Sequence, residues 1–559
     1  MDYSNHSIGG YEALENNPSS CCNFEHQCSD YSTNNSEVRA GHFTRNFHGA
    51  KEEFVIAKKI SNGAPFFLRH SIPEATGFNL FTVGQACLIA SMLIFSTTLL
   101  NIAEVVSGCK DDEYTVGNVH NNDGAECNLK LWGLVKPSSL MSIIGTVISL
   151  GSSLLLPVIG AVIDHTSYRK QVGTWTAFLI VTLNVIQIGV SIESFSVMLI
   201  TFILLGYLLA VNFCVSEAYL PDLNMDDKEM GSFASDFNII FYASIFLFLA
   251  MVHCVSQYLH LDEIGTCRAS QITAVVCFIV FWIYPWKYLF TNRPALHEVP
   301  DGKSLISTGF VSVWHTVNDI YQNFPDLGTF VLSLMFLNGA LGSLLSISTT
   351  FLTDVMRLSY TQVMIVFFTA CFSAIPGAVA SNIFIKKIGP LQSYRLCVLV
   401  WAATTFSVAF VFEGKNEWGH VCTFAAIWGF GYGFKDPIDM SIYTTIIPRG
   451  REAEMMGINA LSAGALVWAP NLNFTLLNEM DIPMMYCVSS LSAYFLVSFW
   501  ISLKLPSYQK MAEHAIKYDA DHGSFYSRSA LSDNDDDCSL SSGDDPSGLD
   551  HFLLQHSDV

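Results

Sequence analysis

Between residues 80 and 503 the chain carries about a dozen apolar stretches, each long enough to cross a lipid bilayer. A hydrocarbon core of roughly 30 Å needs about 20 residues of apolar helix. Backbone groups in lipid have no water to bond, so each stretch should be a helix that satisfies its own hydrogen bonds. The sequence therefore predicts an all-α membrane protein that crosses the bilayer many times.

The stretches define twelve predicted spans, and an even number places both termini on the same side. Short loops on that side carry most of the Lys and Arg residues, which places both termini in the cytosol and the long loop 104–137 in the lumen. The predicted spans are 80–103, 138–163, 172–192, 196–219, 233–256, 270–291, 326–350, 361–384, 391–412, 418–440, 455–477 and 483–503.

The longest internal polar connection falls between the sixth and seventh spans. Two six-helix halves joined by a linker are typical of transporters built from two parallel repeats. We therefore expect twelve transmembrane helices in two six-helix halves, flanked by disordered tails. The expected parts are a cytosolic tail 1–76, a first half 77–291, a cytosolic linker 292–325, a second half 326–505 and an acidic cytosolic tail 506–559.

Composition excludes several function classes. Charged residues make up 14% of the chain, and much of the net charge of -21 lies in the C-terminal tail, so nothing suggests nucleic-acid binding. We find no nucleophile–base pair or metal-spaced cluster at membrane depth, and therefore expect no enzyme, cofactor or metal site. The N-terminal group Cys21, Cys22, His26 and Cys28 matches no standard zinc spacing and is interpreted as reduced thiols.

Two cysteines differ from the others because they lie in a polar loop. Cys109 and Cys127 both fall between the first and second spans. If that loop is luminal, a disulfide between them is compatible with the redox state there, and two free thiols are the alternative.

The loop between the second and third spans carries a spaced motif. Gly160 is followed four residues later by Asp164, and then by the basic pair Arg169 and Lys170. This pattern resembles the loop signature of the major facilitator superfamily. Glycine allows close helix packing, and the carboxylate can cap a helix or pair with a base. The resemblance implies a gating role for these four residues; a generic loop with positive-inside charges is the alternative.

A second segment narrows the resemblance. Residues 447–454, Ile-Pro-Arg-Gly-Arg-Glu-Ala-Glu, resemble a run of the autophagy-related vacuolar amino-acid effluxers and their bacterial relatives. In that family a Gly-containing helix and then a Gly-Pro pair follow, and here Gly457, Gly464 and the pair Ala469-Pro470 occupy those places. The resemblance adds Arg449, Arg451 and Glu452 to the gating candidates.

The chain departs from that family at the end of the tenth span. Where relatives tend to have Gln and Ser-Arg, this chain has Asp436, Asp439 and Met440. The departure leaves the expected fold unchanged and the substrate open.

The resemblance also implies that the first, fourth, seventh and tenth spans line a central cavity. Their polar and aromatic residues supply what an amino-acid substrate needs, namely acceptors, donors and an apolar pocket. Interhelical hydrogen bonding and packing are the alternatives for each of them. The substrate-binding candidates are Asn101, Tyr207, Asn212, Asn338, Trp428 and Tyr432.

Charge inside a span is costly unless it is paired or hydrated. Lys435 stands beside Asp436 and four residues before Asp439, on the cytosolic half of the tenth span. We expect these three residues to form a charged gate whose carboxylates carry a coupling proton. The alternative is a lysine that snorkels to the membrane surface from a helix end.

Both tails contain short sorting patterns. Tyr11 and Leu14 fit a tyrosine-based signal, and Asp550, Leu553 and Leu554 fit an acidic dileucine signal. Cytosolic adaptors would read both, which favours a vacuolar or lysosomal membrane over the cell surface.

Together these features predict a secondary transporter that exports small solutes, neutral amino acids first, from vacuole or lysosome to cytosol by alternating access. Its partners would be the substrate, protons, membrane lipid and sorting adaptors. Two alternatives stay open: a carrier of another metabolite, such as a sugar, peptide or organic anion, and a receptor or scaffold that kept the fold without transport.

Overall fold

A computed structural model describes residues 72–108, 130–220, 227–292, 304–412, 418–448 and 452–515, with Leu223, Lys517 and some residues between 58 and 70. These residues form helices and turns, with one isolated antiparallel bridge between Leu131 and Val135 and no sheet among them. The sorting candidates, Cys109, Cys127, Arg449 and Arg451 lie outside the described residues.

The first six predicted spans each correspond to a helix or a run of helices. The sixth is a composite in which a π-helical turn, η5, joins two α-helices. The bounds are α3 Pro73–Val106, α4 Leu140–His165 preceded by η3 Pro137–Ser139, α5 Arg169–Gln187, α6 Phe195–Glu217, α7 Asp227–Leu259, and α8 Glu263–Phe278 with η5 Ile279–Ile283 and α9 Tyr284–Tyr288.

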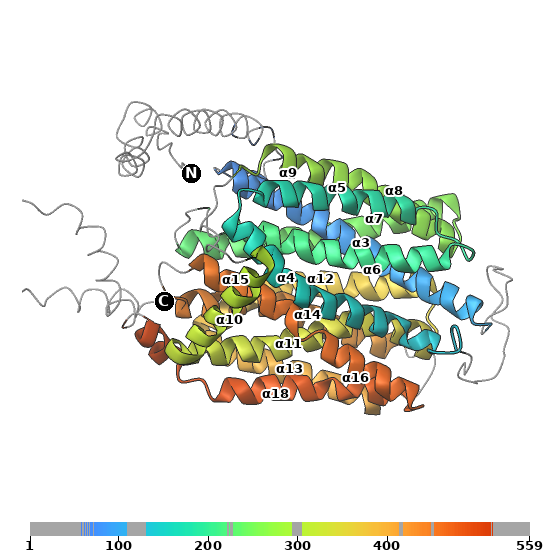
Figure 1. The fold of residues 1–559 in the computed structure, drawn as a ribbon. Helices are drawn as coiled ribbons and strands as arrows, with labels where there is room; N and C mark the ends of the chain where they lie inside the picture. The colour runs from blue at the N-terminus through green and yellow to red at the C-terminus, as the bar shows by residue number, and fades with distance from the viewer. Residues whose placement is uncertain are drawn as a thin grey trace, which may run out of the picture. The chain divides into compact units, whose positions relative to one another are not determined.

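The last six predicted spans are matched in the same way, and the eleventh and twelfth are each divided into two helices. Their bounds are α11 Pro325–Thr350 with η6 Phe351–Val355, α12 Tyr360–Ile388, α13 Pro390–Val411, α14 Trp418–Ile446, α15 Glu452–Ala465 with α16 Trp468–Glu479, and α17 Met484–Ser490 with α18 Ser492–Leu503. Figure 1 shows these helices running side by side.

Ten of the described helices are long and apolar enough to cross a membrane. Among the predicted spans, α5 and α14 fall outside that set. Each carries charge, Arg169 and Lys170 at the start of α5 and Lys435, Asp436 and Asp439 in α14. Both helices still pack within the bundle, since α5 lies against α6 and α14 lies against α12 and α13.

The predicted linker 292–325 contains a helix that the sequence analysis did not anticipate. This helix, α10, covers Leu305–Asn323, and only Phe324 separates it from α11. It packs against α4 of the first half as well as against α11.

Local sequence sets several helix ends. Proline occupies the first turn of α3, α11 and α13, where its missing N–H costs no hydrogen bond. Ser359 and Gln362 form a capping box at the start of α12. Gly389 separates α12 from α13 with a φ of 84°, a left-handed conformation that favours glycine.

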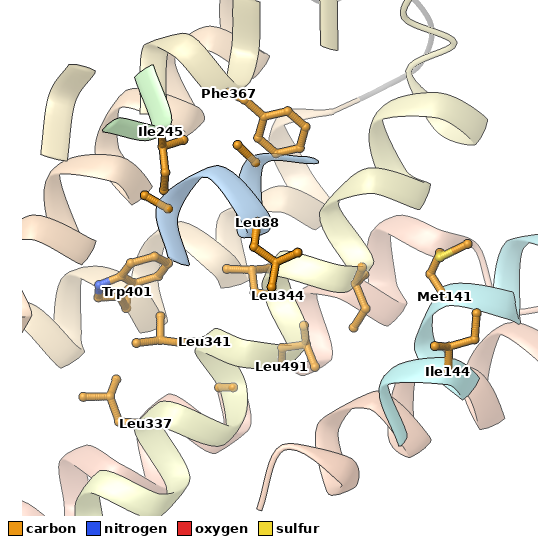
Figure 2. Close-up of a cluster of buried hydrophobic side chains, with 14 of the residues drawn as sticks. Leu88, Met141, Ile144, Ile245, Leu337, Leu341, Leu344, Phe367, Trp401 and Leu491 are labelled. Atoms are coloured by element: carbon orange, nitrogen blue, oxygen red, sulfur yellow. The ribbon is translucent and has the colours of Figure 1, made fainter. Parts of the chain in front are cut away.

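The first and last six spans contact each other chiefly in two places, with further contacts of α11 with α3 and α4 and of α15 with α6. The second span, α4, packs against α15 and α16, and the fifth span, α7, packs against α12 and α14. One continuous cluster of buried apolar side chains draws on both sets of helices. Figure 2 shows part of it, with Leu88 and Ile245 from the first set and Leu344 and Phe367 from the second.

Candidate functional site

The charged residues of α14 form a compact ion-paired cluster. Lys435 is buried, and its Nζ lies 2.8 Å from Asp439 Oδ2 and 3.2 Å from Asp436 Oδ1. The helix continues through Pro437, so Asp439 stays one turn from Lys435. Lys435 therefore pairs inside the bundle, and the snorkelling alternative does not describe it.

The two carboxylates of the cluster differ in their surroundings. The Asp439 side chain is 13% exposed, and neither oxygen accepts a hydrogen bond of ordinary geometry from a described residue. Its contact with Lys435 Nζ is an ion pair. A buried carboxylate with one partner depends strongly on that partner, because an uncompensated charge in low dielectric is costly.

Asp436 connects the two sets of helices. Its side chain is 37% exposed, and its Oδ2 accepts a long hydrogen bond of 3.5 Å from the Tyr242 hydroxyl of α7. Tyr242 was not among the sequence-based candidates. The charged cluster therefore touches both helix sets near the middle of their spans.

A cavity of ≈ 100 Å³ lies among the helices of the last six spans, lined in part by residues of α14 that precede this cluster. Tyr432 lines it and stands one helical turn before Asp436, so the cavity and the carboxylate are neighbours along α14. Its lining is almost wholly apolar and includes Leu344, Phe367, Phe412, Phe424 and Trp428.

Two aromatic side chains that line the cavity carry polar groups. The Tyr432 hydroxyl donates a hydrogen bond of 2.8 Å to the Leu341 carbonyl. The Trp428 Nε1 is buried and has no acceptor among the described residues. Because buried indole N–H groups usually find a partner, Trp428 Nε1 is an unusual donor without an acceptor among the described residues.

The remaining substrate candidates lie elsewhere. Asn338 on α11 is half-buried and forms no side-chain hydrogen bond with a described residue, so it remains available. Tyr207 donates a 2.8 Å hydrogen bond to the Val147 carbonyl of α4, and Asn101 donates to Glu263 of α8. Both tie helices within the first six spans together.

Asn212 is fully buried between α5, α6 and η5. Its Nδ2 donates to the Gly173 carbonyl and to Thr176 Oγ1, and its Oδ1 accepts from Trp282 Nε1 at 2.8 Å. These bonds account for Asn212 as a structural residue in this conformation. Its predicted contact with substrate stays a prediction.

Two of the gating candidates line a second cavity. Gly160 and Asp164 border a space of ≈ 120 Å³ between α4, α6, α10 and α15, together with Glu217 and Gly457. Glu452 is the first residue of α15. This cavity lies between the two helix sets on the side predicted to be cytosolic.

Arg169, another gating candidate, is buried beside the end of α6, and its gating role stays a prediction. It is 2% exposed, its Nη1 donates 3.1 Å to the Ala218 carbonyl at the end of α6, and its guanidinium lies over the Tyr219 ring. A cation at a helix C-terminus is favourable. Arg169 thus joins α5 to α6, while its neighbour Lys170 is half-buried.

A polar clasp on the predicted luminal side escaped the sequence analysis. The Lys136 Nζ donates 2.8 Å to the Asn478 carbonyl and pairs with Asp481, while the Lys136 backbone N–H donates 2.9 Å to Glu479. Lys130 lies 3.3 Å from Glu479. These bonds join the start of α4 to the end of α16, so they connect the two helix sets. The one feature of the sequence that could have indicated these contacts is the charge at the ends of the second and eleventh spans.

Comparison with protein families decides the fold family. The model of the Major Facilitator Superfamily matches residues 77–470. The chain belongs to this superfamily of transporters. The predicted fold class, an all-α membrane protein of the major facilitator type, is confirmed.

Solved structures agree on the fold at low identity. The human organic anion transporter MFSD10 (TETRAN) is 14% identical over 76% of this chain and 99% of its own, with a TM-score of 0.52. A variant of the nucleoside transporter NupG is 13% identical over 78% of this chain and 100% of its own, also at 0.52. A D-xylose–proton symporter is 12% identical over 78% and 98%, at 0.53. No curated protein sequence matches the chain.

Proposed function

We propose that this superfamily member is a secondary transporter of small solutes that combine a charged group with an apolar part, neutral amino acids first. The observation that carries the proposal is the apolar cavity whose lining residue Tyr432 stands one helical turn before Asp436 of the Lys435–Asp436–Asp439 cluster. An amino acid can place its side chain among Phe424 and Trp428 and its ammonium beside Asp436. Trp428 Nε1 supplies a donor for its carboxylate.

Asp439 is the proposed carrier of a coupling proton. Proton uptake would neutralise the carboxylate and leave Lys435 paired with Asp436 alone. Because Tyr242 attaches Asp436 to the first helix set, a change in the Lys435 pairing reaches the contact between the two sets. Alternating access between such sets is the mechanism expected for a fold built from two repeats.

We further propose that transport runs from an acidic vacuole or lysosome to the cytosol. The support is the distribution of Lys and Arg among the loops and the sorting patterns at Tyr11 and at Leu553-Leu554. Replacing Leu553 and Leu554 by Ala should move part of the protein to the cell surface. If the double variant stays in the same membrane as the unmodified protein, the sorting signal is Tyr11 or another element.

The substrate proposal is tested by flux into proteoliposomes that hold a pH gradient. The panel contains radiolabelled leucine, phenylalanine, a nucleoside, a pentose and an organic anion. We expect leucine or phenylalanine to be taken up fastest. Trp428→Phe should raise the KM at least several-fold because it removes one hydrogen bond to a charged group. Trp500→Phe, on the exposed face of α18, is the matched control and should transport normally.

The alternatives predict different outcomes. Fast flux of the sugar, nucleoside or anion, with no amino-acid flux, would replace the substrate class and leave the transporter proposal intact. No flux of any solute from well-folded protein would favour a receptor or scaffold.

A further inference from the structure

The linker helix α10 presents an apolar surface outward. Its exposed residues Ile306, Phe310, Trp314, Val317 and Tyr321 are spaced by four, four, three and four positions. At about 100° per residue they share an arc of roughly 80°. Trp314 is 71% exposed and Tyr321 is 81% exposed. Large apolar side chains gathered on one face in this way indicate a partner for that face.

A second sector of α10 packs on the protein. Gly309, Thr316 and Ile320 are buried there. A Cβ at Gly309 would overlap the backbone carbonyl of Pro157 in α4 and crowd Ala161. The third sector is mostly polar and exposed, with Ser307, His315, Asn318 and Gln322. The apolar sector therefore lies next to the packed sector, and the polar sector faces away from both.

The surface of α4 under α10 identifies the apolar sector's partner. Pro157 and Ala161 share an arc of roughly 80° with Val147, Leu150 and Leu154, again at about 100° per residue. Those three side chains are exposed and apolar on a helix that is apolar enough to span the membrane. That face of α4 is thus the one that meets lipid. The helix α10 packs against the end of α4 (Figure 1).

We propose that α10 lies within the boundary of the lipid bilayer on the side of the linker, with Ile306, Phe310, Trp314, Val317 and Tyr321 inserted among the acyl chains and headgroups. Trp and Tyr favour this depth, since their rings are apolar and their N–H and O–H groups reach water. Residues 305–323 contain no Lys or Arg. Insertion is therefore driven by apolar area and does not depend on anionic lipid. The inference does not require the proposed substrate.

The test places the photoreactive residue p-benzoylphenylalanine at one position at a time in the full-length protein. Trp314 and Tyr321 sample the apolar sector, and their sequence neighbours His315 and Gln322 sample the polar sector. Each variant is illuminated in phosphatidylcholine nanodiscs, with and without phosphatidylserine, and analysed by intact-mass spectrometry. All four sites are exposed, so each variant should fold, and size-exclusion chromatography checks this.

We expect phospholipid adducts at 314 and 321, at least ten times more abundant than at 315 and 322, and equal in the two lipid mixtures. Three results would overturn the proposal. Adducts to the protein's own tails would make α10 an intramolecular docking site. Equal lipid adducts at all four positions would mean that the helix is immersed on every side. If no lipid adduct forms at 314 and 321, and these positions cross-link to another protein in native membranes, the apolar sector is a protein interface.

Discussion

Lys136 at the start of the second span donates a 2.8 Å hydrogen bond to the Asn478 carbonyl at the end of the eleventh. The same amine pairs with Asp481, and Asn478 in turn donates 2.8 Å to Ser138 and Ser139. The bonds join the two helix sets on the predicted luminal side. Motion of the sets that opens this side must break them, so the clasp biases the protein toward the closed arrangement there.

The first prediction concerns the strength of the clasp. Lys136→Met should open the predicted luminal side in a larger share of molecules, by roughly tenfold, because hydrogen bonds to charged groups contribute about 1.5–3 kcal/mol. Spin labels at Leu134 and Met480, both exposed, would report the change as a longer distance by pulsed electron resonance.

Lys130→Met is the matched control for this prediction. Lys130 is 42% exposed and contacts Glu479, so its removal should change the distance distribution much less. Identical distributions for Lys136→Met and the unmodified protein would show that the clasp does not hold the two sets.

A second prediction concerns the clasp and pH. The hydrogen bond from Lys136 holds the pKa of Asp481 below its usual range. A lowered pKa means that the contact is present above that pKa and lost as pH falls through it. Since a free Asp titrates near 3.9, the clasp should remain ionised in a mildly acidic lumen. The label distances should be equal at pH 7.5 and 5.5 and lengthen only below about pH 4. Lengthening between 7.5 and 5.5 would contradict this.

The sequence predicted the helices better than it predicted the site. Twelve spans were recognisable because a bilayer demands long apolar runs, and even the charged tenth span was found. The helix α10 was missed because its apolar residues are spread over one face and do not form a run. The clasp was missed because its charges lie at span ends, where charge is ordinary. Asn212 was recognised as a candidate because it is polar and lies in a span, but the same features fit a residue that hydrogen-bonds between helices, as it does with Trp282.

A third prediction concerns the packing that positions the charged cluster. A Cβ at Gly433 of α14 would overlap the Ala374 carbonyl of α12. Gly433→Ala should therefore separate the two helices and lower the free energy of unfolding by about 1–3 kcal/mol. Because Gly433 is two residues from Lys435, transport should fall as well.

Gly419 in the same helix provides the matched control. A Cβ there would meet nothing within 4 Å among the described residues, so Gly419→Ala should leave both the unfolding temperature and transport near those of the unmodified protein. Equal unfolding temperatures for the two variants would show that α12 and α14 adjust without cost.

The last prediction tests whether Lys435 and Asp439 act as one unit. Lys435→Met leaves the Asp439 carboxylate buried without its counter-charge, and breaking such a pair typically costs about 3–5 kcal/mol. Asp439→Asn costs less, since Lys435 keeps its contact with Asp436 at 3.2 Å. In the double variant Lys435→Met/Asp439→Asn most of the lost stability should return, because no buried charge is left unpaired. Thermal unfolding in detergent measures all three, with Lys510→Met, at an exposed position beyond α18, as the control for losing a lysine. If the two single effects simply add in the double variant, Lys435 and Asp439 contribute independently to stability. Protonation of Asp439 would then not alter the interactions of Lys435, and it would have no effect on the contact between Asp436 and Tyr242.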